Sequence, residues 1–265
     1  MSFTPVVPLT GYAGWTFLTR TIDSQKNAFE GSAAVTQSVE YFAENIDDIT
    51  SAEDLVNDRR LLEVALGAFG LGEDINNKFF IQKILEEGTS SDDALANRLA
   101  DKRYAAFADA FGFADGDIPA TQDPQFAAEV ADLYTEKQFE IAVGDQNGDF
   151  RIALNAQREL TELADRNISD SAKWFTMMGN PPLRDLFETA LALPSEVSQL
   201  DLDKQLEIFR EKSEQRFGTD KISDFADPEM QEDLIRLFIV QSEMQAAQTS
   251  TSSGAIALTL LQGVS

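Results

Sequence analysis

The spacing of apolar residues constrains the fold of this chain more than any other feature of its sequence. Helix signals recur from about residue 23 to residue 246, whereas the apolar–polar alternation of β-strands is scarce. Leu95 and Leu99, and then Phe107 and Phe111, fall at helical spacing, as is typical of helices that face a core. The pattern predicts an all-α, multi-helix fold.

Capping signals divide this pattern into separate helices. Asp23 or Ser24 can cap a helix that runs towards Asn45, and Thr50 with Glu53 forms a capping box before the next helix. Each of these residue types can accept a hydrogen bond from a backbone N–H that the helix itself leaves unpaired. We therefore expect helix starts at these positions.

Further signals continue along the chain. Asp58 is expected to start a third helix, Gly88 to close a short amphipathic one, and the segment 92–113 to form a single helix. The segments 121–144 and 149–167 are typical of two long helices joined by a turn, an αα-hairpin.

Two stretches of the sequence resemble each other, which indicates an internal repeat. The segment 42–48 is similar to 163–170, and 62–66 is similar to 187–191. Two copies are too few for a solenoid. The repeat therefore predicts one helical domain built of two similar halves.

The predicted domain spans residues 23–246. Its halves cover about residues 23–125 and 149–246, and a long helix joins them. An N-terminal arm, residues 1–22, precedes the domain, and a flexible tail, residues 247–265, follows it. The tail is expected to be flexible because it begins with a Ser/Thr-rich linker.

The charge of the chain excludes two classes of partner. Forty-six acidic and 21 basic side chains leave a formal net charge of -25. Such a surface repels phosphate backbones and anionic lipid head groups, so we expect no nucleic-acid partner. No stretch reaches the length of a membrane span, and Pro5 and Pro8 interrupt the apolar N-terminus, so we expect neither membrane insertion nor a Sec signal.

The chain contains neither Cys nor His. Thiolate nucleophiles, zinc-thiolate sites and His-based triads are therefore excluded. Catalysis would have to use carboxylates, Lys, Tyr or a cofactor. We expect a chain that is not an enzyme and that has no cofactor.

The segment 144–150, "GDQNGDF", partly matches a calcium-binding loop. Asp145, Asn147 and Asp149 occupy ligand positions 1, 3 and 5, but Phe150 replaces the required Gly and Ala156 the required Glu. We expect a turn at Asn147 and the following glycine, with Asp149 as the cap of the next helix.

Other candidate motifs have structural explanations. The glycine run "GAFGLGEDI" at 67–75 predicts a helix end and a turn rather than a phosphate loop. The pairs Asp47-Asp48 and Asp92-Asp93 are expected at helix starts. We therefore predict no catalytic, cofactor-binding or metal-binding residue.

Two groups of apolar residues can serve either the core or an interface. Trp15 and Trp174 are packing anchors or interface hot spots, and we favour core packing. The segment 255–264, "AIALTLLQGV", either folds back onto the domain or docks into a partner. In the second case Leu258, Leu260 and Leu261 are the expected contacts; we favour the first.

Three segments, 11–46, 65–113 and 191–240, carry a resemblance to a known family. They resemble an alpha-proteobacterial domain of unknown function that is often encoded among flagellar genes. The resemblance implies an all-helical protein with a role in flagellar assembly, export or structure. It also implies a protein partner, either a flagellar component or the export apparatus, and a location in the cytoplasm or export by a flagellar-type route without a cleaved signal.

Two functional hypotheses follow. The first is a non-enzymatic structural or interaction protein linked to flagellar assembly, although the chain lacks the sustained terminal heptads expected of a subunit of the flagellar axis. The alternative is a carboxylate-based, metal-dependent hydrolase of unknown substrate. Three or more carboxylates around one concave pocket, rather than spread over solvated helix faces, would favour the alternative.

Overall fold

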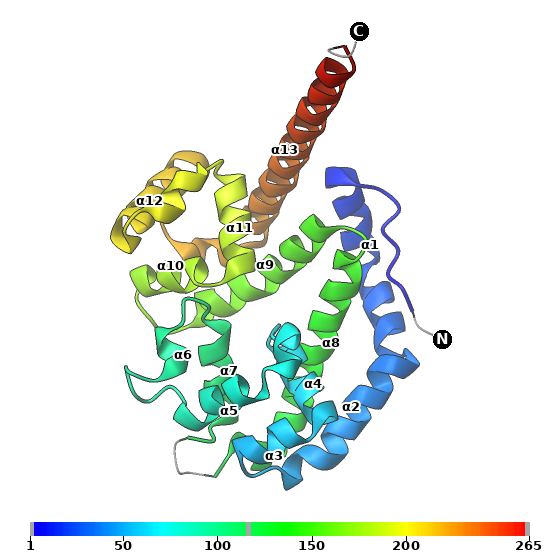
Figure 1. Ribbon diagram of the computed structural model, residues 1–265, viewed down its shortest axis with the longest axis vertical. Helices are drawn as coiled ribbons and strands as arrows, with labels where there is room; N and C mark the ends of the chain where they lie inside the picture. Colours follow the sequence, from blue (N-terminus) through cyan, green and yellow to red (C-terminus); the bar gives the residue numbers. More distant parts are fainter. Residues whose placement is uncertain (1–2, 115–117, 263–265) are drawn as a thin grey trace. The chain divides into compact units, whose positions relative to one another are not determined.

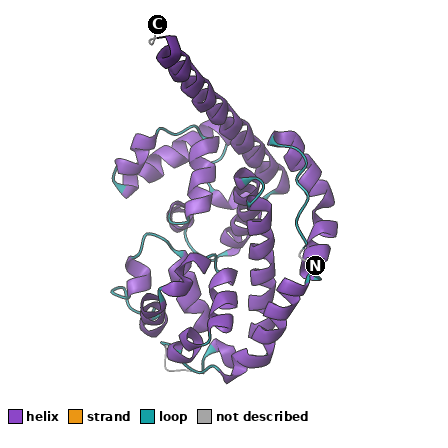
Figure 2. Ribbon diagram, turned by 45° about the vertical axis from the view of Figure 1, so that its right-hand side comes forward, coloured by secondary structure: helices purple, strands orange, loops and turns teal. Residues whose placement is uncertain are grey.

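A computed structural model describes residues 3–114 and 118–262, with side chains described as far as Gln248. Within these residues the chain forms thirteen α-helices and five short 3-10 segments, and it forms no strand (Figures 1 and 2). The predicted all-α class is confirmed. Across the described residues, no helix combines the length and the apolar character that a membrane span requires.

The chain divides into two compact units. Unit 1 comprises the residues up to Val7 together with Leu18–Gly148, and unit 2 comprises Pro8–Phe17 and the chain from Asp149 onwards. Helix α1, Gly11–Glu30, therefore contributes to both units. The long helix expected to join two halves, α8, belongs to unit 1.

Unit 1 is a helical body in which α4 packs on α8 and on α2, and α2 also packs on α8. Besides the end of α1, its helices are α2 Ala33–Asn45, α3 Ala52–Asn57, α4 Arg59–Ala68, α5 Lys78–Glu87, α6 Leu95–Arg98, α7 Arg103–Phe111 and α8 Phe126–Gly144.

The close approach of α4 and α8 depends on Gly67. A Cβ at this position would lie 2.8 Å from the ring of Tyr134, closer than real Cβ contacts allow. Rings of α7 and α8 extend the same core: Phe107 and Phe111 on α7 lie 5.0 Å apart, and Phe111 meets Phe126 of α8 edge to face, also at 5.0 Å. Such pairs stabilise a core by about 0.5–1.5 kcal/mol beyond their buried area.

Two of the predicted helices are each divided in the structure. The helix expected from Asp23 or Ser24 to Asn45 is wrong at its start, because α1 already begins at Gly11 and the chain breaks at Gly31 and Ser32 before α2. The N-terminal arm therefore includes the first turns of a helix.

The second divided helix is the one predicted over residues 92–113. It forms α6 and α7, with a non-helical connection at Leu99–Lys102. Asp101 helps to start α7, because its carboxylate accepts a hydrogen bond from the backbone N–H of Arg103 (3.0 Å) at the beginning of that helix. The same carboxylate also accepts from the guanidinium of Arg103 (2.7 Å).

The predicted caps can be compared with those in the structure. Asp58 caps α4, accepting from the backbone N–H of Arg60 and Leu61 at 2.9 and 3.0 Å, and Gly88 closes α5 with a φ of 62°. The capping box lies one residue later than predicted. Ser51 accepts from the N–H of Asp54 (3.1 Å) and donates to its carboxylate (2.7 Å).

Unit 2 is built on α13, which packs on α11, while α10 packs on α11 and on α12. Its helices, besides the first turns of α1, are α9 Gly148–Asp165, α10 Asp170–Met178, α11 Pro181–Ala190, α12 Leu202–Phe217 and α13 Pro228–Gln262. Trp15 and Trp174 are both fully buried, which confirms their role in core packing.

Helix α13 continues past the predicted end of the domain into the predicted tail. The sequence predicts that the domain ends near residue 246, but the backbone of α13 is helical as far as Gln262. Residues Glu243–Gln248 are all exposed. The flexibility of the segment 247–265 stays a prediction.

Candidate functional site

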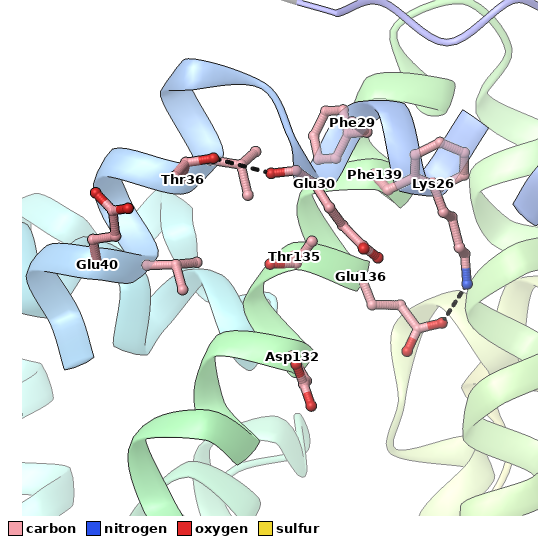
Figure 3. A pocket seen from close by; sticks show the side chains of 11 residues that line it. Lys26, Phe29, Glu30, Thr36, Glu40, Asp132, Thr135, Glu136 and Phe139 are labelled. Carbon is pink, nitrogen blue, oxygen red and sulfur yellow. Dashed lines mark hydrogen bonds and ion pairs between the residues drawn. The ribbon is translucent and has the colours of Figure 1, made fainter. Parts of the chain in front are cut away.

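A cavity of about 450 Å³ opens on the surface of unit 1, between the end of α1, α2 and α8 (Figure 3). We call it the acidic pocket. It is lined by Lys26, Phe29, Glu30, Val35, Thr36, Val39, Glu40, Asp132, Thr135, Glu136 and Phe139.

The floor of the acidic pocket is apolar. Phe29 from α1 and Phe139 from α8 are buried and meet edge to face, with ring centroids 5.6 Å apart and planes at 75°. Val35 and Val39 lie one turn apart on α2 and complete the floor. The rings are thus fixed by packing before any ligand arrives.

The break between α1 and α2 positions this wall of the pocket. The N–H of Ser32 donates to the carbonyl of Phe29 (3.0 Å), which ends α1. The hydroxyl of Thr36 then donates to the carbonyl of Glu30 (3.2 Å), tying the first turn of α2 to the last residue of α1. The chain therefore turns so that both helices face α8.

The rim of the acidic pocket carries four carboxylates from three helices: Glu30, Glu40, Asp132 and Glu136 (Figure 3). Lys26 is the one cation among the lining residues, and its ammonium pairs with Glu136 at 2.8 Å. Among the residues that the structure describes, the other three carboxylates have no ion-pair partner. The rim therefore has an excess of three negative charges.

This charge arrangement is unfavourable for the helix itself. Asp132 and Glu136 lie four residues apart on α8, where like charges destabilise a helix by about 0.2–0.5 kcal/mol. The ion pair with Lys26 offsets part of the repulsion, but both partners are about one-third exposed (32% and 35%), so its contribution is small. A cationic ligand would relieve the remainder.

The carboxylates do not form a metal centre. No group of three or more His, Cys, Asp or Glu side chains within the described residues is placed to hold a metal ion. Four carboxylates therefore surround one pocket, as the hydrolase hypothesis requires, but they do not converge on one point. The arrangement can hold an ammonium or guanidinium group against the rim while its apolar stem lies on the rings of the floor.

The partial calcium loop forms the predicted turn. Residues 145–147 connect α8 to α9, and α9 begins at Gly148. Asp149 was expected to cap α9, but it lies inside the first turn, where its carboxylate accepts a hydrogen bond from the hydroxyl of Ser242 (2.6 Å). The carboxylate of Asp149 is thus oriented by a hydrogen bond within the protein.

Two of the other motifs have the structural roles expected of them. Helix α4 ends at Ala68 and the glycine run continues into a turn, with the N–H of Gly70 donating to the carbonyl of Gly67 (3.1 Å). Asp47 and Asp48 lie in the short 3-10 segment Ile46–Asp48. The prediction for Asp92 and Asp93 is wrong: both are exposed in the turn before α6, whose N-cap position is Ala94 and whose first turn holds no acidic residue.

The predicted contact residues Leu258, Leu260 and Leu261 belong to the backbone of α13, but their side chains lie outside the described residues. The proposal that they contact a partner stays a prediction.

Sequence reasoning missed the acidic pocket. One local signal was available, because Asp132 and Glu136 place two like charges on one face of α8. The other walls come from residues about a hundred positions earlier in the chain, as the ion pair from Lys26 shows.

The chain is similar to a solved structure. The X-ray crystal structure of protein AGR_C_984 from Agrobacterium tumefaciens matches with a TM-score of 0.73 and 29% sequence identity. The match covers 91% of this chain and 99% of that chain. No curated protein matches significantly.

The sequence profile of one family matches residues 68–230, and its description is "Protein of unknown function (DUF1217)". Because this match covers more than half of the 265 residues, the chain belongs to the DUF1217 family.

Proposed function

We propose that this chain is a non-enzymatic interaction protein that binds a protein partner through the acidic pocket of unit 1, in flagellar assembly, export or structure. The observation that supports binding is the combination of an aromatic floor with a rim that has three excess negative charges. Binding pockets commonly have this composition, in which apolar side chains provide affinity and a few polar or charged groups fix the orientation of the ligand.

The expected partner is basic. At low ionic strength a net charge of -25 attracts cationic surfaces over distances beyond the pocket and speeds their encounter. The floor of Phe29 and Phe139 then favours a Lys or Arg side chain that has an apolar neighbour. The partner is thus recognised by charge at long range and by the rings at short range.

The link to the flagellum rests on sequence resemblance. The segments 11–46, 65–113 and 191–240 resemble a family often encoded among flagellar genes, and membership of the DUF1217 family supports that resemblance. The partner is then a flagellar component or a part of the export apparatus. The protein acts in the cytoplasm or is exported by the flagellar route.

Gene deletion followed by complementation tests this proposal. Deletion is expected to reduce swimming and the number of flagella, and the wild-type gene to restore both. Glu40→Lys, which reverses a rim charge, is expected not to restore them. Glu44→Lys is the matched control, because Glu44 is also exposed on α2 but does not line the pocket. Normal swimming after deletion, with no flagellar partner in a pull-down, would refute the proposal.

The second candidate is a carboxylate-based metal-dependent hydrolase: four carboxylates line one pocket, as this function requires, although no three of them in the described structure are placed to hold a metal ion. Titration of the purified protein with Mn²⁺ in a calorimeter separates the two functions. An interaction protein is expected to show no saturable binding of the ion. Saturable binding that Asp132→Asn abolishes would instead support the hydrolase.

A further inference from the structure

A second groove, in unit 2, has the opposite charge. Two hollows of about 350 and 260 Å³ share Arg216 and Leu237 and so form one continuous depression between α12 and α13. We call it the basic groove. Helix α13 packs on α11 and on the 3-10 segment Ile222–Ala226, while α12 packs on α10.

Three cations and one carboxylate line the basic groove: Lys212, Arg216, Arg236 and Asp233. Arg236 pairs with Asp233 at 2.7 Å. Lys212 donates only to the amide oxygen of Gln215 (3.3 Å), and Arg216 has no acidic partner within the part of the chain that the structure describes. The groove therefore carries two excess positive charges in a chain whose net charge is -25.

Helix stability explains only part of this cluster. Arg216 lies in the last turn of α12, where a cation interacts favourably with the helix dipole. Lys212 lies a turn earlier, and Arg236 lies in the middle of the described part of α13. Their convergence on one groove has no such explanation.

The groove also exposes apolar side chains. Leu237 and Val240 line the groove on one face of α13, and Met244 continues that face beyond the groove at helical spacing; Val240 and Met244 are 39% and 51% exposed. This stripe extends over roughly 10 Å at 1.5 Å per residue. An apolar stripe of this kind, flanked here by an excess of positive charge, is a surface that can receive the apolar face of an amphipathic helix.

One residue of the lining has an unusual backbone. Ala192 follows α11 with a φ of 50°, in the left-handed region that favours glycine. The N–H of Leu193 donates to the carbonyl of Glu188 (2.8 Å), the bond that closes a Schellman motif. Glycine would fit this backbone better, and the methyl group that is present adds to the apolar lining.

We propose that the basic groove docks an acidic amphipathic helix of a partner protein. Apolar side chains spaced three or four residues apart on that helix pack on Leu237, Val240 and Met244. Carboxylates on its flanks pair with Lys212 and Arg216. This contact is independent of the acidic pocket, because it uses the other unit and selects the opposite charge.

The net charge of the chain sets the conditions for the contact. At long range the chain repels an acidic partner, but at about 0.15 M salt charges more than about 8 Å apart are largely screened. The local attraction of the basic groove then decides the outcome. Binding is therefore measured at this ionic strength.

A designed peptide pair provides the probe. The first peptide is an 18-residue fluorescein-labelled helix with Leu along one stripe and Glu on both flanks, and the second has Lys in place of every Glu. Fluorescence anisotropy with the full-length protein is expected to give micromolar binding of the acidic peptide. Arg216→Glu and Val240→Asp are each expected to weaken it at least tenfold.

Two control variants make the result specific. Arg166→Glu applies the same charge change at an exposed site of unit 2 outside the groove, and Glu40→Lys alters the acidic pocket; both are expected to change binding less than twofold. Absence of binding of the acidic peptide overturns the inference, as does equal weakening by Arg166→Glu and Arg216→Glu. Glu40 lines only the acidic pocket, so the proposed function is tested by the complementation experiment with Glu40→Lys. The basic groove is tested by the peptide assay, and either proposal can fail without the other.

Discussion

Replacing Trp174 by alanine tests how unit 2 is held together. The side chain is fully buried, with its ring 5.7 Å from that of Phe187 and 6.2 Å from that of Phe209, and its indole N–H donates to the carbonyl of Asp220 (2.8 Å). A truncation of this kind costs about 3–5 kcal/mol, because both the transfer free energy and the contacts around the resulting cavity are lost.

The same substitution can be expressed as a melting temperature. At about 3 °C per kcal/mol, which applies to chains of 150–250 residues, Tm is expected to fall by roughly 9–15 °C. Trp174→Phe keeps a ring but leaves the Asp220 carbonyl without its donor, so it is expected to cost about 1–3 kcal/mol. If the two units unfold in separate transitions, only the transition of unit 2 should move.

Urea unfolding followed by circular dichroism measures these costs, with a constant m-value as evidence that the denatured state is unchanged. Phe79→Ala is the control, because Phe79 is 82% exposed and its loss is expected to change stability by less than about 0.5 kcal/mol. The reasoning is refuted if Trp174→Ala costs less than about 1 kcal/mol, or no more than the control.

Three further predictions concern a cap, two glycines and the tail. Burial is the largest single influence on the pKa of Asp58 and raises it, but hydrogen bonds from the Tyr41 hydroxyl and from the N–H groups of Leu61 and Arg60 outweigh burial and hold the pKa below its usual value. Asp58 therefore stabilises the fold above its unfolded pKa of about 4. Asp58→Ala is expected to cost about 1–2 kcal/mol at pH 7, measured by urea unfolding. The difference between the two proteins should shrink as the pH falls through the lowered pKa of Asp58 in the folded state. Gly88 and Gly112 have φ of 62° and 63°, but of the two only Gly88 has a neighbour in the way: a Cβ there would lie 2.5 Å from the Cβ of Ala114. Gly88→Ala should therefore lower Tm clearly more than Gly112→Ala, and equal effects would exclude the clash. The sequence favours a tail that folds back onto the domain, but α13 is exposed on all sides from Glu243 to Gln248, so truncation after Gln248 is expected to leave Tm nearly unchanged; a fall of several degrees would show that the tail belongs to the fold.

The sequence predicts the class of the fold because helical spacing and capping are local. Asp58 and Gly88 act on backbone groups within a few residues, so their roles could be inferred without knowledge of the rest of the molecule. The break at Gly31 could not, since apolar residues continue at helical spacing on both sides of it. The turn is instead fixed by hydrogen bonds such as that from Thr36 to Glu30.

The acidic pocket and the basic groove cannot be predicted from the sequence, because each depends on how separate helices pack. The acidic pocket joins helices about a hundred residues apart along the chain, whereas the basic groove lies between the consecutive helices α12 and α13; in both cases the charges meet only through the packing of separate helices. Lys26 and Glu136, 110 residues apart, are the plainest case. Lys212 and Arg216 do form a visible basic pair on α12, but nothing local indicates that Leu237 lies opposite them.

The inclusion of Pro8–Phe17 in unit 2 has a consequence for synthesis of the chain. The Tyr12 hydroxyl donates to Glu232 (2.7 Å) across 220 residues of sequence, and the ring of Trp15 meets that of Phe150 at 5.9 Å. During translation, the helices of unit 1 leave the ribosome while these N-terminal residues still lack their partners. Unit 2 is therefore completed only after almost the entire chain has been made, and a fragment that starts at Asp149 would leave Phe150 without the ring that covers it.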